Sequence, residues 1–130
     1  HPHIISHNLE TVKRLYTIRK GSFYKRSLNV LKSIKKINPK QSTKSGIMVG
    51  FGETETEVID LMKDLIKIEC DFFSIGQYLA PSKEHYPVKD FIHPDQFEKY
   101  KNIGIELGFK HIEAGPYVRS SYHAKEYYHG

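Results

Sequence analysis

Four short segments of the sequence carry polar side chains that could do chemistry together. They are "SHNLET" (6–11), "GFGET" (50–54), "GQYLAPS" (76–82) and "GPYVRSSYHA" (115–124). In the first, an amide at Asn8 and a carboxylate at Glu10 stand two residues apart. A carboxylate that accepts from a ribose diol, beside an amide that orients a polar group, would suit a nucleoside. The alternative for Asn8 is a plain helix cap.

The second segment belongs to "GIMVGFGE" (46–53), which leads into a predicted helix. Gly46, Gly50 and Gly52 carry no side chain, so a flat ligand could approach the backbone there. Free N–H groups at the start of the helix could hold an anion or a polar ring edge. The spacing is neither G-x-G-x-x-G nor a P-loop, because no Lys-Ser/Thr follows. A tight strand-to-helix turn without a ligand would have the same sequence.

In the third segment, Gln77 could bond a ligand and Tyr78 could stack on one, although Tyr78 suits core packing equally well. The histidines show no H-x-x-x-H or H-E-x-x-H spacing, which disfavours zinc. No G-x-S-x-G is present, so a serine nucleophile has no support. Cys70 is the only cysteine. It excludes a disulfide framework and a cysteine-ligated cluster built from this chain alone, and it reads as a buried structural thiol.

Strands and helices alternate along the chain and would position these segments. Predicted strands are 3–7, 45–52, 70–82 with its exit loop, and 109–118. Predicted helices are 22–40, 54–69 and 94–108, and residues 8–16 are a turn that passes into a helix. Ser22 is the predicted cap of the helix 22–40, and Thr54 with Glu57 makes a capping box. Pro94 near a first turn and Gly108 as a C-cap bound the last helix. The alternation indicates parallel β/α units, whose chemistry lies at the carboxyl ends of the strands. All four segments would then meet at one edge.

Composition sets the broad class of protein. The chain has 130 residues, 38% of them hydrophobic and 12% aromatic, which predicts one packed domain and excludes general disorder. The net charge is +5, with many lysines between residues 13 and 44. These lysines either solvate helix faces or suit an acidic partner, and no nucleic-acid signature accompanies them. We expect no membrane segment, a missing beginning because His1 comes first, and a cytoplasmic location unless a transit peptide lies in the missing part.

Taken together, the segments resemble consecutive landmarks of the lipoyl synthase family. The matching stretches are "SHNLETV" (6–12), "TKSGIMVGFGETETEV" (43–58), "SIGQYLAPSKEHYPV" (74–88) and "GPYVRSSYHA" (115–124). They stand in the family's order, from about residue 5 to 124. "GQYLAPS" and "RSSYHA" are specific to the family, whereas "GIMVGFGE" resembles a motif shared more widely among radical S-adenosylmethionine (SAM) enzymes.

The resemblance implies the C-terminal part of a radical SAM partial (β/α) TIM-type barrel, in residues 1–115, followed by a tail, 116–130, that carries "RSSYHA". It implies a sulfurtransferase that inserts two sulfur atoms at C6 and C8 of a protein-bound octanoyl group. The implied cofactors are two 4Fe–4S clusters and SAM. The family's two cysteine triplets are absent from this sequence, so we expect them in the missing half and expect this chain to be inactive alone.

The resemblance also implies partners. They are the missing N-terminal half of the same enzyme, an electron donor and octanoylated lipoyl-carrier domains, with no nucleic acid and no membrane. The carriers are acidic proteins such as dehydrogenase E2 subunits or the glycine cleavage H protein, which would suit the positive charge of this chain.

The resemblance assigns roles to particular residues. Glu10 would bind the ribose hydroxyls, and Lys44 with Ser45 would meet the methionine carboxylate. Ser120, with Arg119 adjacent, would ligate the auxiliary cluster, although local chemistry alone does not separate Ser120 from Ser121. The implied cofactor-binding residues are Asn8, Glu10, Lys44, Ser45, Gly46, Met48, Gly50, Gly52, Glu53, Gln77 and Tyr78.

Two other functions stay open from the sequence. A different radical SAM enzyme, such as a biotin-synthase-like one, would share an "HNL" segment and a similar glycine motif, but "RSSYHA" disfavours it. A non-catalytic α/β module that binds a nucleotide is the third. Two cysteine triplets upstream in the complete reading frame would favour the lipoyl synthase.

Overall fold

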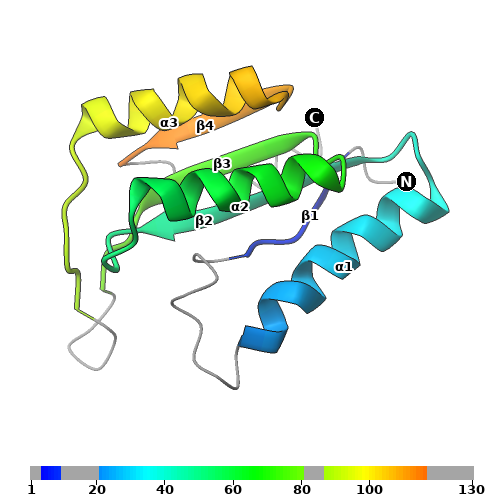
Figure 1. Ribbon diagram of the computed structural model, residues 1–130, viewed down its shortest axis with the longest axis horizontal. Helices are drawn as coiled ribbons and strands as arrows, with labels where there is room; N and C mark the ends of the chain where they lie inside the picture. The colour runs from blue at the N-terminus through cyan, green and yellow to red at the C-terminus, as the bar shows by residue number, and fades with distance from the viewer. Residues whose placement is uncertain (1–3, 10–20, 81–86, 117–130) are drawn as a thin grey trace.

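The computed structural model describes residues 4–9, 21–80 and 87–116. The elements are β1 (Ile4–Ser6), α1 (Gly21–Ile37), β2 (Ser42–Val49), α2 (Glu55–Lys67), β3 (Phe72–Gln77), α3 (Pro94–Leu107) and β4 (His111–Gly115). The strands form one parallel sheet in the order β1-β2-β3-β4 (Figure 1). The predicted parallel α/β fold is confirmed, and strands that lie side by side in chain order are consistent with part of a TIM-type barrel.

Most of the predicted helix boundaries are confirmed by hydrogen bonds. The N–H of Glu57 donates to the hydroxyl of Thr54 at 3.2 Å, and the N–H of Thr54 donates to the Glu57 carboxylate at 2.8 Å. Gly108 ends α3 with a φ of 121°. One expectation about α1 is wrong. The helix begins at Gly21, so Ser22 lies inside it and not at its cap.

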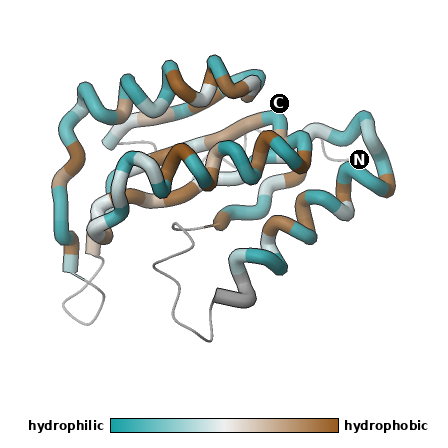
Figure 2. Tube along the Cα trace, in the orientation of Figure 1, coloured by the Kyte–Doolittle hydropathy of each residue, from teal (hydrophilic) through white to brown (hydrophobic). Residues whose placement is uncertain are grey.

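The two faces of the sheet differ in character because side chains alternate along each strand. One face packs against the helices and is apolar, and apolar stretches recur along α2 and α3 beside it (Figure 2). Its strand residues include Ile47, Val49, Phe73, Ile75 and Ile112. We call the opposite side of the sheet the inner face. By the strand register it carries Lys44, Gly46, Met48, Phe72, Ser74, Gly76, His111, Glu113 and Gly115. The helices therefore form an outer layer, and most residues of the inner face other than Met48 and Phe72 are small or polar.

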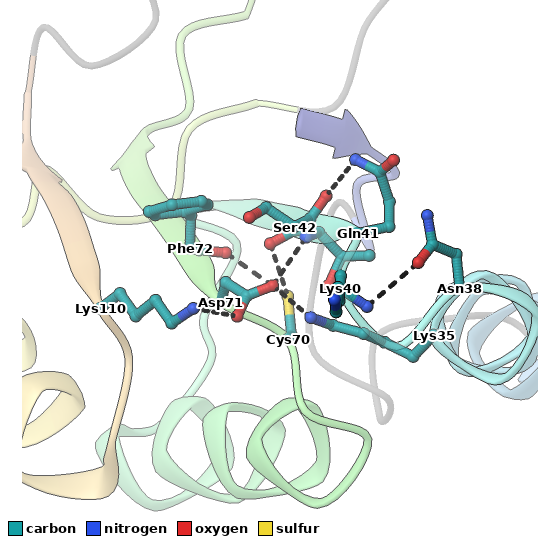
Figure 3. A network of polar contacts seen from close by, with 10 residues as sticks. Lys35, Asn38, Lys40, Gln41, Ser42, Cys70, Asp71, Phe72 and Lys110 are labelled. Atoms are coloured by element: carbon teal, nitrogen blue, oxygen red, sulfur yellow. Dashed lines mark hydrogen bonds and ion pairs between the residues drawn. The ribbon is translucent and has the colours of Figure 1, made fainter. Parts of the chain in front are cut away.

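A buried carboxylate joins three elements at the amino ends of the strands (Figure 3). Asp71 precedes β3, and its carboxylate accepts from Lys35 of α1 at 2.6 Å and from the N–H of Thr43 in β2 at 2.8 Å. Lys110, just before β4, lies 3.2 Å from the other carboxylate oxygen. The Asp71 side chain is only 8% exposed. The edge of the sheet at the amino ends of the strands is thus held by charge-assisted hydrogen bonds.

A close approach between α3 and β4 accounts for Gly104. A glycine within a helix costs about 1 kcal/mol relative to alanine, so it usually has a packing reason. Here a Cβ on Gly104 would collide with Cδ1 of Ile112 and would lie 3.4 Å from the sulfur of Met62. The absence of a side chain lets the helix sit close to the sheet.

Gly104→Ala is therefore expected to lower the free energy of unfolding by about 1–3 kcal/mol through overpacking. Ile112→Val removes the colliding Cδ1 and should cost about 0.5–1.5 kcal/mol alone. The double variant should then lose less free energy of unfolding than the two single variants lose in sum. Urea unfolding in a double-mutant cycle would measure the difference. Strict additivity would contradict this account of Gly104.

Candidate functional site

The segment that follows β1 continues beside β2 and places Asn8 on the inner face. The N–H of His7 donates to the carbonyl of Lys44 at 2.9 Å, and the N–H of Leu9 donates to the carbonyl of Gly46 at 3.1 Å. Leu9 is fully buried in the core, and the His7 ring bonds the hydroxyl of Ser27 in α1 at 3.0 Å. The alternation therefore leaves Asn8 on the side away from the helices, where it is exposed. Glu10 lies outside the described residues.

A buried cation lies deeper on the inner face. Lys44 is 6% exposed, and its ammonium lies 3.8 Å from a carboxylate oxygen of Glu113 in β4. Gly46 and Met48 follow Lys44 on the same face of β2. The structure therefore brings together Asn8, Lys44, Gly46 and Met48. Sequence reasoning missed Glu113, and the only signal was its place in a strand, two residues before Gly115, which fixes the face but not the partner.

Ser45 does not join this group. It follows Lys44 directly in β2, so its side chain lies on the opposite, helix-facing side of the sheet. There it is fully buried, and its hydroxyl has no hydrogen-bond partner among the described atoms. The two side chains expected to meet one carboxylate thus diverge across the sheet.

The turn from β2 to α2 is built from its own glycines and one carboxylate. Gly50 and Gly52 have φ values of 119° and 99°, a region that side chains disfavour. The carboxylate of Glu53 accepts from the N–H of Gly50 at 2.9 Å and from the N–H of Phe51 at 3.2 Å. These glycines and Glu53 therefore serve the turn itself, and a ligand would meet the outer surface of a preformed loop.

Gln77 is the last residue of β3 and Tyr78 follows it, but the two side chains have different surroundings. Gln77 is 3% exposed, and its amide bonds the backbone of Tyr78, Asp90 and Ile92. Tyr78 is half-buried, and its ring centroid lies 4.1 Å from that of Phe51 in a tilted arrangement. Tyr78 therefore extends the carboxyl edge of the sheet with an aromatic surface, whereas Gln77 is occupied by the protein backbone.

The inner face carries a cation that suits the carboxylate of a molecule such as SAM. A Cβ added to Gly115, at the carboxyl end of β4, would meet no atom of the described residues within 4 Å. Lys44 offers this cation, and Glu113 is its ion-pair partner at 3.8 Å. Gly46 and Gly76 are buried on this face, and neither carries a side chain.

The described residues do not fit an iron–sulfur cluster. Within 4–9, 21–80 and 87–116, no group of three His, Cys, Asp or Glu side chains could hold a metal. Cys70 is buried, with its sulfur 3.7 Å from the carbonyl of Thr43, and burial raises the pKa of its thiol to about 11. The prediction of a structural thiol thus agrees with its surroundings. Arg119, Ser120 and Ser121 lie outside the described residues.

Among the described helices, none has the length and apolar character needed to cross a membrane.

Comparison with known proteins gives one consistent result. No family model matches the chain. A lipoyl synthase of Geotalea daltonii is 53% identical over 126 residues, which is 97% of this chain and 43% of the relative. A lipoyl synthase of Caldanaerobacter subterraneus is 57% identical over 124 residues, which is 95% of this chain and 44% of the relative. That of Geobacter metallireducens is 55% identical over 97% of this chain. The chain thus spans less than half the length of these relatives.

Proposed function

We propose that this chain, which resembles lipoyl synthases over 97% of its length, is the C-terminal portion of such an enzyme. The complete protein would insert two sulfur atoms at C6 and C8 of an octanoyl group held on a carrier protein. Identity of 53–57% along nearly all of this chain is the observation that carries the proposal. "RSSYHA" at 119–124 supports it over a biotin-synthase-like enzyme, and nothing in the comparisons favours a nucleotide-binding module.

The described residues would contribute the binding face for SAM. Lys44 would hold the methionine carboxylate, and Asn8, with Glu10 beside it in sequence, would hold the nucleoside. The Gly50–Glu53 turn and Tyr78 would border the same molecule at the carboxyl edge. When bound, SAM supplies the radical that removes hydrogen atoms from the octanoyl carbons. Ser45 and Gln77 would contribute by packing and not by contact, since their side chains lie on the other side of the sheet.

Ser120 would ligate the auxiliary cluster, with the family's cysteine triplets in the part of the protein beyond this chain. A hard oxygen ligand differs from the thiolates that usually hold such clusters. A weaker ligand on one iron would let that iron leave when sulfur is removed.

Ser120→Ala in the complete, cluster-loaded enzyme is expected to abolish lipoyl formation while Ser121→Ala retains it. Iron content and the visible spectrum would report the auxiliary cluster directly, and the mass of the carrier would report the product. Normal product formation by the Ser120 variant would contradict the assigned ligand.

The partner would be an acidic carrier domain. The 17-residue helix α1 contains no acidic residue, and Lys25, Arg26, Lys32 and Lys36 are exposed along it. Lys35 differs from them, because it is bound to Asp71. A surface of one sign accelerates the approach of a partner of opposite sign, and added salt weakens this effect.

The experiment that tests the function uses the complete enzyme with SAM, a reductant and an octanoylated carrier. Mass spectrometry of the carrier should show a lipoyl group, and the rate at limiting carrier should fall as salt is added. Sulfur insertion into dethiobiotin in place of the octanoyl group would favour the biotin-synthase-like alternative. SAM binding without any turnover would favour a non-catalytic module. Either result would overturn the proposal.

A further inference from the structure

Gln77 uses every hydrogen-bonding atom of its side-chain amide to hold the segment that leads into α3. Its Nε2 donates to the carbonyl of Asp90 and to that of Tyr78, both at 2.9 Å. Its Oε1 accepts from the N–H of Ile92 at 2.8 Å. Because the two carbonyls need a donor and the N–H needs an acceptor, the amide fits in one orientation only.

Gly50 packs against this amide from the side of the β2–α2 turn. Its carbonyl accepts from the N–H of Lys89 at 2.7 Å and from that of Asp90 at 3.3 Å. A Cβ on Gly50 would lie 2.5 Å from Nε2 of Gln77 and 2.8 Å from the Asp90 carbonyl oxygen. The fit leaves no room for a side chain, and the positive φ of Gly50 disfavours one as well.

The turn is therefore fixed from two directions. The Glu53 carboxylate binds the N–H of Gly50 from within the turn, and residues 89–90 bind its carbonyl from outside. Gln77 connects that outside segment to the end of β3. The conformation of the Gly50–Glu53 turn thus depends on an amide that is distant from it in sequence.

We propose that Gln77 is a positioning residue, which locks residues 89–92 against Gly50 and so sets the shape of the Gly50–Glu53 turn for SAM. This inference rests on the proposed function, which makes that turn part of the cofactor site. The Gln77 lock, meaning Gln77, Gly50 and the backbone of 89–92, acts through the turn and not by touching the cofactor. Both amide hydrogens are already used and Gln77 is only 3% exposed, so a direct contact would require the lock to open.

Gln77→Glu tests the lock with almost no change in volume. The new oxygen would face two carbonyl oxygens, while the acceptor for the Ile92 N–H would remain. In the complete enzyme, hydrogen exchange at the amides of Lys89 and Ile92 should accelerate by about tenfold or more. The dissociation constant for SAM, measured by equilibrium dialysis, should rise by about 10- to 100-fold, as is common when a supporting group is lost.

Gln41→Glu is the matched control. Gln41 is also buried, at 9% exposed, and its Nε2 donates to a backbone carbonyl, that of Ser42 at 3.2 Å. It precedes β2, at the other edge of the sheet. The folded control variant should bind SAM within about twofold of the unchanged protein, because additive effects hold between distant sites.

Gly50→Ala should disturb the same lock from its other side. The double variant Gly50→Ala, Gln77→Glu should then bind SAM no more weakly than the weaker single variant, within about threefold. Full additivity would overturn the lock. So would faster exchange with unchanged SAM binding, or unchanged exchange in Gln77→Glu. Weaker SAM binding without faster exchange would make Gln77 a direct contact. If the unchanged enzyme failed to bind SAM, the proposed function would fall first, before any variant is compared.

Discussion

Asp71→Ala is expected to lower the free energy of unfolding by about 3–5 kcal/mol, because it leaves a buried cation without its partner. Lys35 is 11% exposed and reaches the Asp71 carboxylate at 2.6 Å, so water cannot readily replace the lost oxygen. The N–H of Thr43 loses its acceptor at the same time. Urea unfolding followed by circular dichroism would measure the change, with Asp60→Ala on the exposed side of α2 as the control, expected within about 0.5 kcal/mol.

The Asp71 carboxylate should also make the free energy of unfolding depend on pH. Burial raises the pKa of Asp71, but hydrogen bonds from Lys35, Thr43 and Lys110 outweigh burial and hold the pKa below its ordinary value of 3.8. A group with a lowered folded pKa stabilises the protein fully above its unfolded pKa, and this contribution is lost as the pH falls through the folded value. Asp71→Asn should remove this loss of stability below about pH 4. An Asn variant with unchanged acid sensitivity, or an Ala variant with unchanged stability, would contradict the role of Asp71.

Lys44→Met in the complete enzyme should weaken SAM binding about 10- to 100-fold, since a hydrogen bond to a charged group contributes about 1.5–3 kcal/mol. Lys44 is a nearly buried cation on the inner face, and methionine keeps most of the apolar stem while it removes the ammonium. Equilibrium dialysis measures the dissociation constant, and product formation under saturating SAM separates binding from turnover.

Two controls make the Lys44 result specific. Glu113→Gln weakens the 3.8 Å ion pair but keeps the Lys44 ammonium, so SAM binding should change less than about threefold. Lys40→Met removes an exposed cation and should leave binding unchanged. Equal losses in Lys44→Met and Glu113→Gln would make the ion pair itself the important feature. An unchanged dissociation constant in Lys44→Met would contradict the proposed contact with the carboxylate.

Features that depend on neighbours in sequence were predictable. The capping box at Thr54 and Glu57 and the glycine end of α3 at Gly108 follow from residues a few positions apart. The parallel pairing of the strands follows from the alternation of strands and helices along the chain. The alternation along β2 also predicts that Lys44 and Ser45 face opposite sides, so their joint assignment by resemblance conflicts with the strand itself.

Features that depend on distant contacts were not predictable. The sequence near Gln77 predicts a ligand-binding amide. It does not reveal the backbone partners of that amide, because two of the three lie in the segment before α3. The sequence likewise predicts space for a ligand at Gly50. The Gln77 amide fills that space, and it is remote from Gly50 in the sequence. The roles of Glu10 and Ser120 stay predictions, since both residues lie outside the described part of the chain.

The order of the strands bears on how the protein is made. Each described strand after β1 pairs with the strand before it, so every new β/α unit can add to a surface that has already left the ribosome. Parallel pairing joins residues that are distant in the sequence, such as Lys44 and Phe72, and this slows the addition of each unit. Lys110 is the last of the Asp71 partners to emerge during synthesis. Completion of that buried ion cluster would therefore coincide with the arrival of β4, the final strand of this sheet.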